Sequence, residues 1–572
     1  MTAAPASDAV PRAWARTVIV LSALVLLVFV GIYAVNGPEW DHVNSAEIFD
    51  RWDRGQFTFE YLFRQHNEHR KAAPRLAILS LGSLTRWNNP AEMYVHWALM
   101  CLTAFVVYGA FRRELADKAR ALVWFVPMML LLVSPRSYDA LLGDGFPHYL
   151  SILFLIAALR ILAFGRPTWT ALAGAIGCGL VTSFSMTNGL LVWPFGLVLM
   201  LADLRTTPPR GSVSRSLVWA LAGAATFAFY FHGYKDPGNH TSPWLIIQHP
   251  TIALRHFLAL NGSVLAPEVK SAEVFGTVML VLDAGLLFAV LSDWWPNRER
   301  PPFGFWLVAI AVVSAFMITA NRAGFGIEQG LSSRYTAMLA LAPIGLYWAL
   351  VVRAGQWRFA GLLSISVATL MIVGYLMASV DAWSAAPGVA SRRRWMAYIN
   401  YSAKQQPSSL LAKLYPNPDH ARIYSAAMER MRYNVFADPH VRPEDLVATT
   451  TPADYSVQTV NGQPAGPDTL IEIDPSGTVD VTGWAMNGRQ NGPARAVFLT
   501  IDGTRDLPAV EGLLNDMLGG PVRGRARRWS AFEGSFGGFV LTPGEHTLAV
   551  RIVEDDGRHA YASPVIARII RR

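Results

Sequence analysis

Long apolar runs constrain this chain more than any other feature. Most of them extend over roughly 16 to 22 residues, enough for a helix to cross a bilayer core of about 30 Å. Of the 572 residues, 52% are hydrophobic and 16% charged, against about 25% charged in a typical soluble protein. The sequence therefore predicts a polytopic α-helical membrane protein, and it excludes a disordered chain or a purely soluble enzyme.

About eleven membrane-spanning helices are expected from these runs. The expected spans are Thr17–Val35, Glu92–Phe111, Ala121–Val133, Tyr149–Phe164, Trp169–Phe184, Gly189–Leu204, Ser216–Tyr234, Val274–Leu291, Phe303–Ala320, Tyr335–Val352 and Phe359–Ser379. The first run is long and is followed by no small-residue cleavage site, so it reads as a span and not as a signal peptide. The transmembrane domain is expected to cover residues 1–381, with a large first outer loop over residues 36–91.

Basic residues gather in every second loop of this pattern, as Arg112, Arg205 and Arg298 illustrate. The positive-inside rule places these loops and the N-terminus in the cytoplasm, and everything after about Asp381 outside it. For a bacterial cell this means a multi-pass inner-membrane protein whose C-terminal part is periplasmic. The net charge of +8 then reflects loop orientation and contact with membrane lipid, and no nucleic acid partner is expected.

The C-terminal part divides into two segments. Residues 382–465 are polar, with helical periodicity over Ile423–Val435, and we expect short helices on the outer membrane surface. The basic run at 392–394 is expected to contact lipid headgroups. Residues 466–572 alternate between apolar and polar positions and contain frequent turn residues, which predicts an antiparallel β-sandwich. Its expected strands include Thr478–Trp484, Ala496–Ile501, Phe539–Leu541 and His546–Val553.

The first outer loop holds the densest group of candidate catalytic residues. It contains Glu39, Asp41, Asp50, Asp53, Glu60, Glu68, His42, His66, His69, Arg64, Arg70 and Arg75. Carboxylates can act as general bases, and guanidinium groups can bind phosphate in a bidentate manner. His66 and His69 are three residues apart, which is not the spacing of a zinc protease, so no metal is assigned. A divalent cation on Glu39 and Asp41 stays open.

Other outer loops add polar residues close to the ends of the expected spans. Together with the first loop they supply the expected ligand-binding set, which is Arg64, His66, His69, Arg70, Arg136, His148, Asn188, Arg322, Arg334 and Tyr335. Arginines at the non-cytoplasmic face of a membrane need a physical reason, and an anionic ligand would supply one. The chain lacks a phosphate-binding glycine loop, a Gly-x-Ser-x-Gly elbow and a dinucleotide fingerprint, so no organic cofactor is expected.

Three sequence motifs resemble those of a known superfamily. The run Gln65-His66-Asn67-Glu68-His69-Arg70, followed by Pro74-Arg75-Leu76, is similar to a loop motif of bacterial GT-C glycosyltransferases. Ser333-Arg334-Tyr335 before a span resembles theirs as well. The run VTGWAMNGRQNGPARAVFLTIDG looks like small β-domains attached to bacterial glycosyltransferases. A charged first outer loop and a soluble outer C-terminus agree with the same architecture.

The resemblance implies an inverting sugar transfer on the outer face from a polyprenyl-phosphate-linked donor to a cell-envelope glycan or lipid. It also implies that an acid early in the first outer loop is the base, which by position is Asp41, with Asp50 and Asp53 as alternatives. Glu68 is the second expected catalytic residue. A transporter or flippase for a lipid-linked glycan and an O-antigen polymerase or ligase stay open as alternatives.

Overall fold

The computed structural model describes residues 9–115, 125–126, 129–205, 212–238, 242–298, 300–437, 440–487, 492–515 and 528–572. The chain forms two compact units. The helical unit consists of Met1–Ile32, Phe57–Ser80 and Ala91–Ser384. The second unit consists of Tyr33–Gln56, Leu81–Pro90 and Ala385–Arg572, so the first outer loop is divided between the two.

Long apolar helices build the helical unit. They are α1 (Ala9–Tyr33), α5 (Asn89–Glu114), α8 (Phe146–Phe164), α9 (Trp169–Ser183), α10 (Val192–Arg205), α11 (Val213–Phe231), α14 (Val269–Asn297), α15 (Phe303–Arg322), α17 (Leu341–Arg353) and α18 (Ala360–Tyr401). Within the described residues, eight helical stretches are long and apolar enough to cross a membrane, and α9 is a shorter apolar helix. The protein is therefore a multi-pass helical membrane protein.

The expected spans coincide with helices wherever the structure describes them, although α14 and α18 are longer than expected, and the expected count of about eleven spans is not confirmed. Most of the expected span 121–133 lies outside the described residues. Helix α18 continues to Tyr401 beyond the expected end at 379, so the expected domain boundary at 381 falls inside a helix. Buried residues at Ala382, Ala386, Ala390 and Arg393 recur every three or four positions, which is the period of a helix with one packed face.

The backbones of α15 and α17 approach each other closely. A Cβ atom added to Gly304 of α15 would lie 2.3 Å from the carbonyl oxygen of Gly345 in α17. A Cβ atom at Gly345 would meet the Gly304 carbonyl oxygen at 2.4 Å. These two glycines therefore let the helix axes approach more closely than larger side chains would permit.

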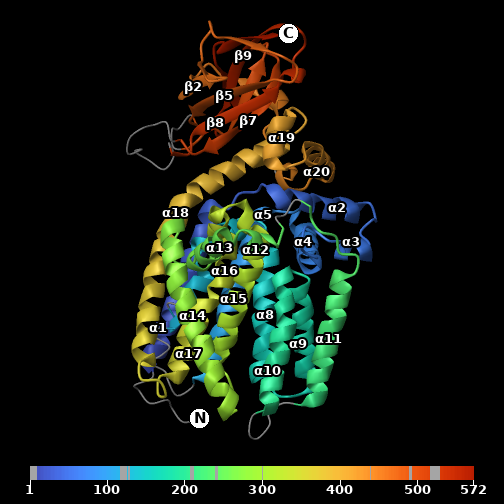
Figure 1. Ribbon diagram of the computed structural model, residues 1–572. Coiled ribbons are helices and arrows are strands. Elements are labelled where there is room, and N and C mark those ends of the chain that lie inside the picture. The colour runs from blue at the N-terminus through green and yellow to red at the C-terminus, as the bar shows by residue number, and fades with distance from the viewer. Residues whose placement is uncertain are drawn as a thin grey trace. The chain divides into compact units, whose positions relative to one another are not determined.

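Short helices gather at one end of the helical unit (Figure 1). They include α3 (Phe59–Phe63), α4 (Ala72–Thr85), α12 (Leu245–Gln248), α13 (Pro250–Gly262) and α16 (Thr336–Leu339). Single-turn 3-10 helices lie between them, namely η4 (Pro135–Ser137), η5 (Thr187–Leu191) and η8 (Ser333–Tyr335). Helices α4 and α13 were not expected from the sequence. Pro250 opens α13 at its first position, where its fixed φ favours helix initiation.

The second unit contains a helical part and a curled sheet. The helical part includes η2 (Trp40–Ser45), α2 (Ala46–Asp53), α19 (Ser408–Leu414), α20 (Pro418–Met431) and the end of α18. Helix α20 confirms most of the helical periodicity seen from residue 423 onward. Asn434 fixes this part, since its Nδ2 donates to the Trp87 carbonyl at 2.7 Å and to the Asn89 side chain at 2.8 Å.

The sheet is formed by short strands in the order β1-β10-β9-β6-β7-β8-β5-β2-β3, with β11 joining β4 to β9. The strands are β1 (Val447–Ala448), β2 (Tyr455–Val460), β3 (Gln463–Pro464), β4 (Leu470–Ile473), β5 (Thr478–Ala485), β6 (Ala496–Ile501), β7 (Arg505–Leu513), β8 (Ala531–Gly537), β9 (Gly544–Val553), β10 (His559–Ala562) and β11 (Ala567–Arg571). Among the described strands, β7 pairs with both β6 and β8 and so joins the halves into one curled sheet, whereas a β-sandwich has two sheets.

The expected strands at β5, β6 and β9 are confirmed, and the expected strand Phe539–Leu541 is wrong. Gly538–Val540 form the 3-10 turn η11 instead. Turn residues on both sides, Gly537 and Pro543, leave too few positions there for an alternating strand. The inward residues of the sheet, such as Val481, Leu499 and Val550, form its hydrophobic core.

Candidate functional site

A tight turn at residues 66–69 carries Glu68 and His69, which are central to the charged groups of the helical unit. His66 and His69 exchange backbone hydrogen bonds of 2.7 and 2.9 Å, and Asn67 at the turn has a positive φ of 48°. The turn is anchored by Gln65, whose amide donates to the Lys235 carbonyl at 2.6 Å and accepts from the Lys235 N–H at 3.0 Å. This geometry fixes Glu68 and His69 between α3 and α4.

The carboxylate of Glu68 is held by a cation from a distant helix. Its Oε1 lies 2.7 Å from Nη2 of Arg322, the last residue of α15. The same oxygen lies 3.4 Å from Nε2 of His69. The Glu68 side chain is 13% exposed, so the ion pair is largely removed from water. A partly buried pair of this kind fixes the orientation of both side chains.

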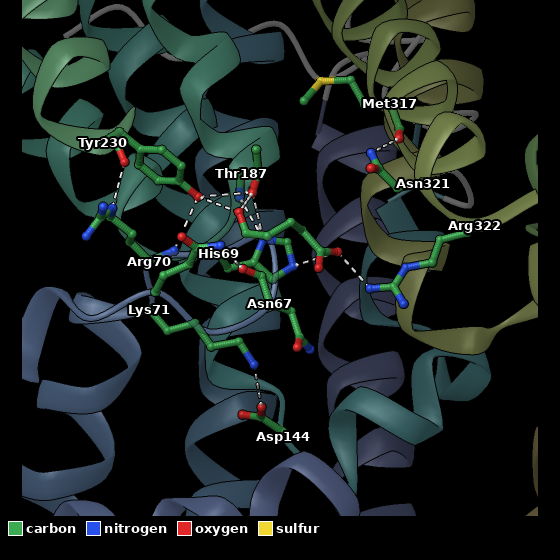
Figure 2. Close-up of polar contacts among 12 residues, drawn as sticks. Asn67, His69, Arg70, Lys71, Asp144, Thr187, Tyr230, Met317, Asn321 and Arg322 are labelled. Carbon is green, nitrogen blue, oxygen red and sulfur yellow. Dashed lines mark hydrogen bonds and ion pairs between the residues drawn. The ribbon is translucent and has the colours of Figure 1, made fainter. Parts of the chain in front are cut away.

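Two hydroxyl groups hold the backbone and the imidazole at this turn (Figure 2). Thr187 Oγ1 lies 2.7 Å from the Glu68 carbonyl oxygen and 2.7 Å from His69 Nδ1. The Tyr230 hydroxyl lies 3.1 Å from the same carbonyl and 3.0 Å from Thr187 Oγ1. Elements η5 and α11 thus meet the turn between α3 and α4 at one polar centre.

Arg70 was expected to face a ligand, but it lies among backbone carbonyl groups. Its Nε donates to the Tyr230 carbonyl at 2.6 Å, and its Nη1 and Nη2 donate to the carbonyls of Phe63 at 2.7 Å and His232 at 2.6 Å. Backbone carbonyls are strong obligatory acceptors, so they bind the guanidinium in place of a phosphate. We therefore assign Arg70 to the scaffold of the turn, in contrast to the expectation that it binds a ligand.

A second charged group lies at the start of α8. Lys71 Nζ is 3.4 Å from Asp144 Oδ2, and both side chains are mostly buried. Arg334, Asp144 and Lys71 are the strongest electrostatic neighbours of His148, and His69 acts on it too. The side chains of the turn and of α8 therefore belong to one charged cluster. We call it the Glu68 cluster, and it contains Glu68, His69, Lys71, Asp144, His148, Arg322 and Arg334.

Cations exceed carboxylates in the Glu68 cluster, where three basic side chains face two acidic ones. Burial is the main cause that lowers the pKa of His69 to about 4, and Lys71, His66 and Arg322 lower it further while Glu68 raises it. His69 is therefore neutral at pH 7, and the positive charge resides on the lysine and arginines. A cluster of this composition suits an anionic ligand.

The remaining expected ligand-binding residues lie around these groups in different roles. Arg136 in η4 is buried, and its Nη1 lies 2.5 Å from Asp381 Oδ2 of α18. The Arg64 guanidinium stacks 4.7 Å from the Tyr61 ring centre. Tyr335 is buried in η8, and Asn188 follows Thr187 in η5. Arg136 is thus neutralised by an internal carboxylate and is not exposed to a ligand.

The segments that carry Arg136 and Arg334 are joined to each other. The Asp139 N–H donates to Ser333 Oγ at 3.0 Å, and Arg136 Nη2 donates to the Leu331 carbonyl at 3.3 Å. Arg334 itself is exposed, and its Nε donates to Ser332 Oγ at 2.9 Å. Of the expected arginines, Arg334 acts on His148 and Arg322 contacts Glu68, so the Glu68 cluster includes both.

Asp41 belongs to the second unit. It is exposed in the first turn of η2, two residues after Glu39. Glu39 Oε1 lies 3.0 Å from Arg393 Nη2 and 3.1 Å from Arg392 Nη2. Burial alone would raise the pKa of Glu39, but Arg393 and Arg392 outweigh it and lower the pKa below the usual 4.5. Two arginines at Glu39 disfavour a divalent cation there.

The basic run at 392–394 has partners within the protein. The Arg393 side chain is 3% exposed and binds Glu39. Arg394 donates to the Gly512 carbonyl at 2.6 Å and stacks 4.6 Å from the Trp529 ring centre. Arg393 and Arg394 therefore bind groups within the second unit, whereas Arg392 is about half exposed, and the expected headgroup contact stays a prediction.

The expected catalytic and ligand-binding sets did not include four residues of the site, namely Lys71, Asp144, Thr187 and Tyr230. Lys71 directly follows the Gln65–Arg70 run, and Asp144 precedes His148 by four residues, so both carried a local signal. Tyr230 carried none, because its role depends on where α11 ends in space. Within the described ranges, no group of three or more His, Cys, Asp or Glu side chains could hold a metal ion.

No protein-family model matches this chain, and no curated protein or solved structure matches it either. The fold and the site define a multi-pass helical membrane protein with a partly buried cationic cluster around one ion-paired carboxylate.

Proposed function

We propose that the protein is a membrane glycosyltransferase. It transfers a sugar from a polyprenyl-phosphate-linked donor to a cell-envelope glycan or lipid on the periplasmic face, with inversion at the anomeric carbon. The observation that carries this proposal is the contact of Glu68 with Arg322 inside a cationic cluster of a helical membrane unit. It supplies an acid–base group and phosphate-binding cations in the same place, where a lipid-anchored anion would need them.

The reaction needs two kinds of group that the Glu68 cluster contains. The acceptor oxygen forms a bond to the anomeric carbon while the bond from that carbon to the phosphate oxygen breaks. A carboxylate takes the proton of the acceptor hydroxyl, and such help contributes about 10²–10⁴ in rate. The lipid phosphate leaves with the bonding electron pair, and fixed cations such as Arg322, Arg334 and Lys71 stabilise its added charge.

Two carboxylates are the candidates for the base. Glu68 is favoured by its place in the cationic cluster. Asp41 is favoured by the GT-C resemblance and by its exposure in the first turn of η2. Asp50 and Asp53 both pair with Arg430 of α20, Asp50 at 2.9 Å, and lie outside the Glu68 cluster, so they rank after these two. The curled sheet of the second unit is proposed to hold the acceptor.

The test compares envelope glycans and lipid-linked sugars from cells with and without the gene. Loss of one glycosyl group, together with accumulation of a lipid-linked sugar on the periplasmic side, is expected. The gene carrying Glu68→Gln should fail to restore the glycan, whereas Glu273→Gln, at an ion pair of α14 with the half-exposed Arg255, should restore it. Unchanged glycans would contradict the proposal. Accumulation of the donor on the cytoplasmic side would indicate a flippase instead.

A further inference from the structure

We infer that Thr187 and Tyr230 are positioning residues which hold His69 as a neutral imidazole with its proton on Nε2, directed at the Glu68 carboxylate. The inference about the tautomer rests on contacts alone. Its meaning for catalysis rests on the proposed function, since Glu68 is one of the two candidate bases. None of the expected site residues included Thr187 or Tyr230.

The Nδ1 atom of His69 is an acceptor. The Thr187 backbone N–H donates to it at 3.2 Å. A backbone N–H cannot reverse its polarity, and the neutral imidazole carries a proton on only one ring nitrogen. A proton on Nδ1 would point at the amide proton of Thr187, so the proton resides on Nε2.

The opposite nitrogen faces a group that can only accept. Nε2 of His69 lies 3.4 Å from Glu68 Oε1, and an ionised carboxylate has no proton to donate. An unprotonated Nε2 would place two lone pairs against each other. The Nε2–H tautomer instead places a donor there. Arg322 binds the same carboxylate oxygen at 2.7 Å, so two donors from different elements restrict the rotation of the Glu68 carboxylate.

The hydroxyl groups complete this arrangement. Thr187 Oγ1 has one proton and lies 2.7 Å from both His69 Nδ1 and the Glu68 carbonyl oxygen. When Thr187 directs that proton to Nδ1, the Tyr230 hydroxyl donates a hydrogen bond to the Glu68 carbonyl oxygen at 3.1 Å instead. The Tyr230 oxygen also accepts the Arg70 N–H at 3.2 Å, which ties it to the turn. Each donor therefore has an acceptor.

The charges around His69 favour the same neutral form. The groups that act on it are Glu68, which attracts a proton, and Lys71, His66 and Arg322, which repel one. His148 of α8 is the further titratable neighbour. Donors on Nδ1 stabilise the neutral ring, because protonation would consume the lone pair that they contact. Removal of the Thr187 hydroxyl should therefore make protonation of His69 easier.

The first measurement reads the tautomer directly and needs no substrate. The full-length protein is labelled with ¹⁵N-histidine in lipid, and the His69 signals are identified by their absence in His69→Gln. At pH 7 we expect a protonated Nε2 and an unprotonated Nδ1. In Thr187→Val the protonated imidazolium should appear at higher pH than in the wild type. An Nδ1–H tautomer, or no change in Thr187→Val, would overturn the inference.

The second measurement is turnover of the lipid-linked donor as a function of pH. Thr187→Val should lower kcat by about tenfold, as expected for one lost hydrogen bond near a reacting group, with a smaller effect on KM. The acid limb of the profile should move to higher pH, and Thr187→Ser should restore both values. Thr226→Val is the matched control, since its hydroxyl only binds the Ala222 carbonyl of its own helix at 2.8 Å.

The outcomes separate the two proposals. The wild-type protein could lack turnover and still hold His69 in the Nε2–H form, with Thr187→Val disturbing that form. This result would contradict the transferase and support the positioning role. Wild-type turnover with an unchanged rate and pH profile in Thr187→Val would support the transferase and contradict the positioning role. Tyr230→Phe provides a second variant, in which the Glu68 carbonyl draws the Thr187 proton away from Nδ1, so kcat should fall and the acid limb should move in the same direction as in Thr187→Val.

Discussion

Arg322 Nη2 lies 2.7 Å from Glu68 Oε1, although 254 residues separate the two in the sequence. The pair joins the end of α15 to the turn between α3 and α4. The two side chains are 22% and 13% exposed, so the contact is better shielded from water than a surface ion pair. Its position makes it the first target for substitution.

Arg322→Lys should retain charge but lose most of the activity. A lysine ammonium is a point charge and cannot contact a carboxylate and a phosphate with the planar fork of arginine. We expect donor turnover to fall by about tenfold or more, because at least one charge-assisted hydrogen bond is lost. Arg255→Lys is the control, since Arg255 forms a half-exposed pair with Glu273. Equal turnover in both variants would contradict a role for the guanidinium fork.

Substitution of the two candidate bases distinguishes between them. Asn and Gln keep the size of the acid but cannot accept the proton, so the true base should lose about 10² or more in rate when replaced. Glu68→Gln and Asp41→Asn are therefore measured with purified protein and donor, together with thermal unfolding to confirm the fold. If Asp41 only favours the start of η2, Asp41→Asn should be nearly silent, because Asn suits a helix N-terminus as well as Asp.

The neutral state of His69 makes the helical unit sensitive to acid. Its pKa is lowered from 6.5 to about 4 in the folded protein, so the unfolded chain binds more protons between these values. Folding stability is therefore full above pH 6.5 and decreases as the pH falls toward 4, by up to about 1.4 kcal/mol per pH unit. Unfolding midpoints measured at pH 7 and pH 5 should differ less in His69→Gln. Thr226→Val, which removes a hydroxyl that binds the Ala222 carbonyl of its own helix, should leave the difference unchanged.

The ion pair between Glu39 and Arg393 should contribute to the folding stability of the second unit. Arg393→Met removes one partner of a buried pair, and such changes cost about 3–5 kcal/mol in unfolding free energy. Arg568→Met should cost less than about 1 kcal/mol, because its contact with Glu545 is about half exposed on both sides. The lowered pKa of Glu39 adds stability above pH 4.5 that is lost as the pH falls through the folded value. Chemical denaturation checks all three statements.

The orientation of the chain can be tested with cysteine variants and an impermeant thiol reagent. Arg205→Cys should be protected in intact cells, because the basic loops are expected in the cytoplasm. Glu60→Cys and Asp480→Cys should be labelled once the reagent reaches the periplasm. Labelling of Arg205→Cys in intact cells would reverse the expected topology.

Sequence periodicity located the helices well, because a span of apolar residues carries its own signal. The expected span at α18 ended before the helix does. The buried stripe of Ala386, Ala390 and Arg393 includes a charged residue, and a charged residue lowers the mean hydropathy by which a buried helix is recognised. Strand Phe539–Leu541 was expected from apolar residues alone, although glycine at 537 and 538 already favoured a turn.

The site was only partly predictable because its contacts connect distant segments. Glu68 and Arg322 were both identified as candidates, but no local pattern shows that they touch. Arg70 illustrates the opposite case, since an arginine satisfied by three carbonyls looks the same in sequence as one that binds a ligand. The positions of Thr187 and Tyr230 follow from helix ends, which sequence patterns locate least well.

The long separation between Glu39 and Arg393 has a consequence for biogenesis. The two residues are 354 positions apart, and Asn36 and Asn89 likewise lie far ahead of Asn434. At about 5–20 residues per second, a ribosome needs roughly 20 to 70 s to synthesise the intervening chain. During that interval the early segments of the second unit have been synthesised without the partners that bury them. This part of the protein therefore matures only after translation is nearly complete, when proteases and chaperones have already had access to it.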